Sequence, residues 1–270
     1  MTDATSATAF LTRQFSDIIR DTLGTNHMKG PPMKITLRDD IPIVPVRITT
    51  ARSTPIHWRE KADAMIQEMI SEDIIVPVHE PTEWLSPGFF VAKHSTTPDQ
   101  NKGHKGAKDD VNLRFVCDLS KLNSVIKRNI HPFPSAKDII NAISDGALWF
   151  LKFDGLHGYH QIPLCPESQK LTAFLLYCGK FMYKRAAQGL STSADEWNRR
   201  SDLAIAGMKN VLKIVDDVLV FASTLDELVR LGTIALQGFR DHNIIRISEQ
   251  DSYLPMYATG DLSSVEDIVC

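Results

Sequence analysis

The sequence lacks the features that would place a protein in or across a membrane. It contains no run of about eighteen apolar residues, so no transmembrane helix is expected. Its N-terminus, Met-Thr-Asp-Ala-Thr-Ser, has no basic stretch followed by an apolar one, so no secretory signal is expected. These absences predict an intracellular protein without membrane partners, in a compartment that no targeting signal specifies.

Cysteine and basic charge are also scarce. The 4 cysteines, at 117, 165, 178 and 270, form no Cys-x-x-Cys pair, which indicates reduced thiols rather than a zinc site or a disulfide framework. The formal net charge is −3 and the pI is about 6.3. A dedicated nucleic-acid-binding module usually has a strongly basic face, so this charge disfavours that class. It does not exclude a polymerase, in which acids hold metal ions while separate basic residues hold phosphate.

The sequence does contain enough apolar residues for one large domain or two small ones, at 43% of 270 residues. Its most informative stretch runs from Lys213 to Phe221, where Asp216 and Asp217 interrupt a β-branched, apolar run. This pattern predicts two buried strands joined by a tight turn that carries both acids. Burying ionised carboxylates costs several kcal/mol unless they are paired or bind a cation. Because Asp-Asp is also a common turn dipeptide, a plain turn and a cation site both remain open here.

A second acid in a similar setting favours the cation site. The apolar strand that begins at Trp149 ends at Asp154. Three carboxylates at strand ends or turns can converge on two hard divalent cations, which prefer oxygen ligands. Paired cations stabilise the attacking and leaving oxygens of an in-line phosphoryl displacement. The acids therefore indicate polymerase or nuclease chemistry.

Several motifs in fixed order resemble those of reverse transcriptases. They are Asp154-x4-Tyr159, the later pair Gln188-Gly189, and the Asp-Asp of the hairpin. The wording Leu-Arg-Phe-Val-Cys-Asp-Leu-Ser-Lys-Leu-Asn at 113–123 and Gly-Tyr-His-Gln-Ile-Pro-Leu at 158–164 is similar to LTR-retrotransposon polyproteins of the Ty3/gypsy type. The resemblance runs from about residue 30 to about residue 248.

The resemblance implies an RNA-directed DNA polymerase, a nucleotidyltransferase that works by a two-metal mechanism. Asp154 and Asp216 would bridge two Mg²⁺ or Mn²⁺ ions, and Asp217 would be the third carboxylate. The implied partners are an RNA or DNA template with its primer, deoxynucleoside triphosphates, and the remainder of a Gag-Pol-type polyprotein. Two alternatives stay open: a catalytically dead retrotransposon remnant, and a domesticated fragment that binds nucleic acid or a protein.

The resemblance also implies residues that bind the incoming nucleotide. Arg114 would contact its phosphates, Tyr159 would pack under its sugar, and Gln188 would contact sugar and phosphate. Gly189 would let the backbone approach closely, and Lys93 would assist with phosphate or template. A surface salt bridge is the alternative for Arg114, and half-buried packing is the alternative for Tyr159. At Ile214 the sequence departs from the family, because many relatives have Tyr there.

The expected fold class is α+β: the fingers and palm of a right-hand polymerase, with helices on one face of an antiparallel palm sheet and no thumb. We expect an N-terminal linker at 1–33, fingers at about 34–130 and 162–190, palm at about 131–161 and 191–250, and an acidic tail, ordered or disordered, at 251–270. Periodicity predicts helices at 9–23, after Ser53-Thr54-Pro55, and at 136–143, 191–208 and 225–241. It predicts strands at 74–78, 89–93, 113–119, 149–154, 161–164, 172–176, 181–185 and 244–248. The polar stretch 94–112 is either a solvated hairpin loop or a fingertip that reaches triphosphate or template.

Overall fold

A computed structural model describes most of the chain and divides it into two compact units. It describes residues 3–93, 111–132, 134, 138, 141–143, 146–214, 217–246 and 256–258. Unit 1 comprises 1–32, 129–163 and 192–270, and unit 2 comprises 33–128 and 164–191. The predicted loop at 94–112 lies almost entirely outside the described residues, as does half of the predicted helix at 136–143.

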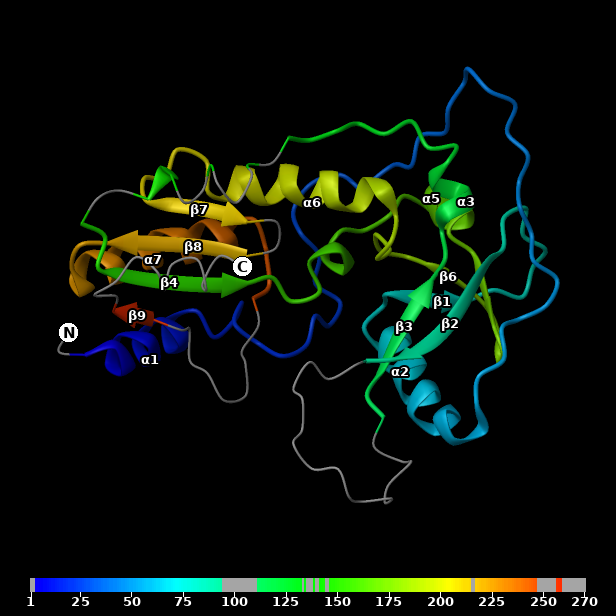
Figure 1. Cartoon of the computed structure of the whole chain (residues 1–270), viewed down its shortest axis with the longest axis horizontal. Helices are drawn as coiled ribbons and strands as arrows, with labels where there is room; N and C mark the ends of the chain where they lie inside the picture. Colours follow the sequence, from blue (N-terminus) through cyan, green and yellow to red (C-terminus); the bar gives the residue numbers. More distant parts are fainter. Residues whose placement is uncertain are drawn as a thin grey trace. The chain divides into compact units, whose positions relative to one another are not determined.

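Unit 1 is built on an antiparallel four-stranded sheet in the order β7-β8-β4-β9 (Figure 1). Its strands are β4 (Trp149–Asp154), β7 (Val211–Ile214), β8 (Asp217–Ala222) and β9 (Met256–Ala258). Its helices are α1 (Ala4–Gln14), the short 3₁₀ helix η2 (Gly158–Gln161), α6 (Ser191–Ala204) and α7 (Leu225–Asp241). The prediction of an antiparallel sheet in this half of the fold is therefore confirmed.

One face of this sheet is apolar and is covered by helix α7. Along β4, alternate residues point to opposite faces, which puts Leu151 and Phe153 on one side. Phe153 packs edge-on against Phe239 of α7, with ring centroids 6.3 Å apart. A Cβ at Gly232 of α7 would lie 2.6 Å from Leu151, so only glycine allows the helix to approach the strand this closely. The opposite face carries the buried cluster Phe150, Leu219 and Phe221 and, at its end, the acids Asp154 and Asp217.

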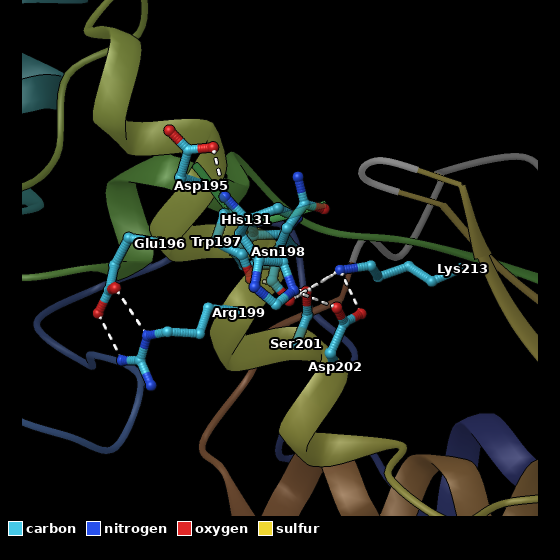
Figure 2. A network of polar contacts seen from close by, with 9 residues as sticks. All are labelled: His131, Asp195, Glu196, Trp197, Asn198, Arg199, Ser201, Asp202 and Lys213. Carbon is cyan, nitrogen blue, oxygen red and sulfur yellow. Dashed lines mark hydrogen bonds and ion pairs between the residues drawn. The ribbon is translucent and has the colours of Figure 1, made fainter. Parts of the chain in front are cut away.

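A buried lysine attaches strand β7 to helix α6 (Figure 2). The Lys213 ammonium donates to the Asn198 carbonyl and to Ser201 Oγ, both at 2.9 Å, and pairs with Asp202 at 2.6 Å. The other Asp202 oxygen lies 2.6 Å from Nε2 of His131. An ammonium in an apolar interior needs such acceptors, because burial without them costs several kcal/mol. The network therefore ties one strand of the hairpin to the helix beside it.

Three predictions in unit 1 need correction, and a short strand lies within the expected tail. The first helix spans Ala4–Gln14 rather than 9–23, and Asp3 caps its start by accepting from the Ser6 amide at 2.8 Å. At the predicted strand 161–164, Gln161 is instead the last residue of η2, and its side chain makes one local hydrogen bond to Leu156 and two tertiary hydrogen bonds to Ile245. Of the predicted strand 244–248, the described residues 244–246 form only single bridges at Arg246, with Ile19 and Gly155, and 247–248 lie outside the described residues. Within the expected acidic tail, 256–258 form β9, because the free edge of β4 offers ladder hydrogen bonds.

Unit 2 contains a five-stranded sheet in the order β1-β6-β5-β2-β3. Its strands are β1 (Ile75–Pro77), β2 (Ser86–Ala92), β3 (Leu113–Cys117), β5 (Phe174–Leu176) and β6 (Gly179–Tyr183). Its helices are the 3₁₀ helix η1 (Ile56–Trp58), α2 (Arg59–Ser71), α3 (Ser120–Asn123) and α5 (Pro166–Leu171). β2 and β5 pair in parallel and the other neighbours are antiparallel, so the sheet is mixed.

Aromatic side chains form much of the core beneath this second sheet. Phe174 contacts Phe115, Phe181 and Tyr183, with ring centroids 5.2–5.9 Å apart. These contacts join β3 to the β5–β6 hairpin, which lies far along the chain from it. The strand predicted at 89–93 is longer than expected and begins at Ser86, because Ser86 and Pro87 pair with β5. Pro87 is tolerated there because it lies near the start of its strand.

Candidate active site

Two of the three predicted catalytic acids lie opposite each other in the unit 1 sheet. Asp154 is the last residue of β4, Asp217 is the first residue of β8, and the two are directly paired across the strands. Directly opposite residues of an antiparallel pair point to the same face, with Cβ atoms about 5 Å apart. Asp216, the third predicted acid, lies outside the described residues. The sequence explains why Asp154 and Asp217 lie opposite each other, because Asp154 ends one apolar strand and Asp217 begins another.

Two basic residues lie near these acids and partly offset their negative charge. The pKa of Asp154 is raised, first by desolvation from its surroundings and second by the like charge of Asp217. Arg246 and Lys152 oppose this shift by favouring the ionised carboxylate. Lys152 lies two residues before Asp154, and its ammonium is 2.9 Å from Oδ2 of Asp217. A pair of carboxylates that repel each other is a natural site for a cation.

The residues present fit a hard divalent cation. Asp154 and Asp217 offer carboxylate oxygens from one face of the sheet, and oxygen is the ligand that Mg²⁺ and Mn²⁺ prefer. In the described part of the chain, no group of three or more His, Cys, Asp or Glu side chains gathers as a metal site. The described pair supplies two carboxylates, and Asp216 is adjacent in sequence to one of them.

The segment after Asp154 is shaped by one tryptophan. Trp197 of α6 is 1% exposed, and a Cβ at Gly155 or Gly158 would come within 2.8 or 2.9 Å of its ring. Glycine at both positions lets the segment cross the indole closely. Between them, His157 has φ 43°, a left-handed conformation that few non-glycine residues adopt. Tyr159 follows on η2 and is half-buried, five residues beyond Asp154.

The predicted nucleotide-binding residues outside this sheet belong to unit 2. Arg114 is exposed on β3, opposite Val91 of β2. Lys93 is exposed just beyond β2, and its backbone amide donates to the Asn112 carbonyl at 2.7 Å. Arg114 lies near the start of β3, and Lys93 lies just after the end of β2. Because the two strands are antiparallel, both residues lie at the same end of the strand pair.

Gln188 and Gly189 form an exposed turn that is anchored by a residue we did not predict. Gly189 has φ +88°, which favours glycine. The Asn123 side chain donates to the Gly189 carbonyl at 2.8 Å and accepts from the Ser191 amide at 2.9 Å. The amide group of the Asn123 side chain therefore anchors the turn through both its nitrogen and its oxygen. No local signal marks Asn123 for this role, since its partners are 66 and 68 residues away.

Sequence reasoning also missed Lys152 and Arg246. Lys152 could have been found, because it lies two residues before Asp154 on a strand and so shares its face. Arg246 is 1% exposed, and its guanidinium lies over Phe153 and Phe239, 5.4 and 4.9 Å from the ring centroids. Its position depends on tertiary packing that the sequence pattern does not reveal.

A comparison with known families assigns the chain. The family described as "Reverse transcriptase (RNA-dependent DNA polymerase)" matches residues 105–250, more than half of the chain. The chain belongs to the reverse transcriptase family. This match includes Asp154, Asp216 and Asp217, and it confirms the predicted family, while the Ty3/gypsy type stays a prediction.

Relatives of this reverse transcriptase domain are polyproteins of transposons and viruses. It is 23% identical over 222 residues to the "Retrovirus-related Pol polyprotein from transposon 412" of Drosophila melanogaster, covering 82% of this chain and 17% of the relative. It is 31% identical over 179 residues to the "Putative enzymatic polyprotein" of Cassava vein mosaic virus, covering 65% of this chain and 25% of the relative. The chain thus spans a quarter or less of the length of these two relatives.

Solved structures confirm the fold. The prototype foamy virus protease-reverse transcriptase matches 97% of this chain and 34% of its own, with a TM-score of 0.76 and 17% identity. The foamy viral enzyme in complex with an RNA/DNA hybrid matches 100% of this chain and 36% of its own, with a TM-score of 0.74 and 14% identity. The α+β fingers and palm fold is therefore confirmed. None of the helices in the described part of the chain combines the length and the apolar character needed to cross a membrane.

Proposed function

We propose that this reverse transcriptase domain catalyses template-directed DNA synthesis at Asp154, Asp216 and Asp217. The observation that carries the proposal is the direct pairing of Asp154 with Asp217 at one end of the unit 1 sheet. Asp216 is joined to Asp217 by a single peptide bond. Three carboxylates of one small region would then hold two Mg²⁺ or Mn²⁺ ions.

The protein's own residues mainly position the substrates and hold charge. Two divalent ions held by these acids would neutralise charge on the primer 3′-oxygen and on the leaving pyrophosphate. Asp154 and Asp217 lie on a sheet fixed by ladder hydrogen bonds, so little reorganisation is needed when substrate binds. Tyr159, half-buried on η2, would pack under the sugar and disfavour a 2′-hydroxyl.

Unit 2 would supply the contacts to the nucleotide and its phosphates. Arg114 and Lys93 are exposed cations at one end of a strand pair, and a guanidinium can chelate phosphate oxygens through its planar fork. Gln188 is exposed on the anchored turn, where Gly189 leaves the backbone open to approach. We therefore assign unit 2 as the fingers and the sheet of unit 1 as the palm.

The proposed partners are a primed RNA or DNA template and deoxynucleoside triphosphates. Support comes from the similar foamy viral enzymes, whose structures contain an RNA/DNA hybrid or double-stranded DNA. The polyprotein relatives support a further proposal, that this domain works as one part of a longer Pol-type polyprotein.

Primer extension on an RNA template at low salt, with Mg²⁺ and with Mn²⁺, tests the proposal. Extension should occur with the wild type and fall to background in Asp154→Asn and Asp216→Asn, because each loses a ligand charge. Asp39→Asn is the matched control, since Asp39 is 82% exposed and far from these acids in sequence. Folded wild type that extends no primer in either metal would refute the catalytic proposal.

A further inference from the structure

Lys152 stands among the proposed metal ligands as a cation of the chain itself. It shares its strand and its face with Asp154, and it lies diagonally across the ladder from Asp217. Its ammonium is 2.9 Å from Oδ2 of Asp217, a distance typical of a charge-assisted hydrogen bond. Both side chains are 31% exposed, so water and ions can reach the pair.

We propose that Lys152 is a tethered counter-ion that competes with the divalent cation for Asp217. The inference rests on the proposed metal-holding role of these carboxylates and adds a control on it. In the metal-free protein the ammonium balances the acids and keeps them together. A divalent ion that binds Asp217 must displace the ammonium or share the carboxylate with it, so Lys152 weakens metal binding to the free domain.

The chemistry of the neighbours indicates that Lys152, rather than Arg246, is the cation that yields. Arg246 is 1% exposed and is enclosed between the rings of Phe153 and Phe239. Lys152 is partly exposed, and its ammonium is carried by a flexible four-carbon stem. It can therefore turn away from Asp217 without rearranging the core. Both cations also act on Asp154, whose pKa is raised by desolvation and by Asp217 against their influence.

The size of the effect follows from charge and distance. A positive charge a few ångströms from a bound divalent ion, in partly exposed surroundings, weakens binding by about one order of magnitude. Removing that charge while keeping the length of the side chain should strengthen binding by the same factor. Keeping the charge on a different head group should preserve the competition.

The test is direct titration with Mn²⁺ alone, without nucleotide or template, following free Mn²⁺ by electron paramagnetic resonance. Lys152→Met should bind Mn²⁺ about tenfold more tightly than the wild type, whereas Lys152→Arg should stay within about threefold of it. Lys209→Met is the matched control, because Lys209 is an exposed lysine of the same unit. The Mn²⁺ affinity of this variant should equal that of the wild type. Asp154→Asn should abolish the binding in both the wild-type and the Lys152→Met background.

A thermal melt separates this role from a purely structural ion pair. Metal-free Lys152→Met should melt below the wild type because two acids lose their counter-ion, and excess Mn²⁺ should remove that deficit. Folded Lys152→Met with unchanged or weaker Mn²⁺ affinity would overturn the inference, as would a lack of Mn²⁺ binding in both proteins. Primer extension by the wild type tests the proposed function separately. Extension, or its absence, is compatible with either a changed or an unchanged Mn²⁺ affinity of Lys152→Met.

Discussion

At the scale of single residues, Lys213 shows how a charge is accommodated inside the palm. Its side chain is 4% exposed, and its ammonium bonds to the Asn198 carbonyl, to Ser201 Oγ and to the negatively charged Asp202. Buried ion pairs are often replaceable by apolar residues of similar size, whereas removing one partner leaves a buried charge without compensation. The two ends of this pair should therefore respond differently to mutation.

We expect Asp202→Asn to lower the free energy of unfolding by about 1–2 kcal/mol, less than in a fully buried pair because Asp202 is 41% exposed, and Lys213→Met to change it by less than about 1 kcal/mol. The asymmetry arises because only the first change strands a charge. Urea unfolding at neutral pH measures both. In the double variant the loss should largely disappear, and a double variant as unstable as Asp202→Asn alone would contradict this explanation.

At the scale of elements, local signals predicted some segments well and tertiary contacts decided the others. Helix α7 has the predicted bounds, because Thr224 caps it and its apolar residues repeat at helical spacing. β4 also has its predicted bounds, since an apolar run ends there at an acid. The prediction failed at Gln161, whose side chain bonds to Leu156 and to Ile245, 84 residues away. Such a contact leaves no periodic trace in the sequence.

The residues of the candidate site also fall into two groups, those that local sequence signals predict and those that only tertiary contacts determine. Asp154 and Asp217 could be predicted because acids at the ends of apolar strands are conspicuous, and strand alternation then places them on one face. Asn123 and Arg246 could not, because their roles depend on which distant segments meet them in the fold.

Helix α6 carries an ion-pair cluster that makes its stability depend on pH. Glu196 pairs with Arg199 at 2.8 Å and with Arg200 at 2.7 Å, and Arg200 also donates to the Pro31 carbonyl at 2.5 Å. Burial would raise the pKa of Glu196, but the hydrogen bonds from the two arginines outweigh it and lower the pKa. A carboxylate with a lowered pKa in the folded state stabilises the protein above its unfolded pKa, and this contribution disappears as the pH falls through the folded value.

We therefore expect Glu196→Gln to cost about 2 kcal/mol at pH 7 and much less near pH 3. Urea unfolding of both proteins across this range measures the difference. Glu83→Gln is the control, since Glu83 is exposed and its loss should change stability by less than about 0.5 kcal/mol at either pH. A deficit of Glu196→Gln that stays constant with pH would show that lost packing, and not charge, is responsible.

At the scale of the whole molecule, the proposed site should reduce stability in return for function. Lys152 only partly offsets the repulsion between the two carboxylates at this sheet end, so a divalent cation still relieves it, and folding and metal binding are linked. The raised pKa of Asp154 is the local sign of this conflict, caused by desolvation and by the charge of Asp217. Because the folded state holds the proton more tightly than the unfolded state, ionisation of Asp154 destabilises the fold.

Asp154→Asn should therefore make the metal-free protein slightly more stable at pH 7, by less than about 1 kcal/mol because the carboxyl is partly exposed and solvent screens its charge. The advantage should vanish at about pH 3, where the wild-type carboxyl is protonated in both states; it should appear as the pH rises through the folded pKa of Asp154. With excess Mn²⁺ the order should reverse, because the wild type gains stability from the bound ion and the variant does not. Thermal melts of the two proteins at both pH values, with and without Mn²⁺, measure all three comparisons. A variant that loses stability at pH 7 without metal would show that Asp154 supports the fold itself, and the site would then carry no strain for a cation to relieve.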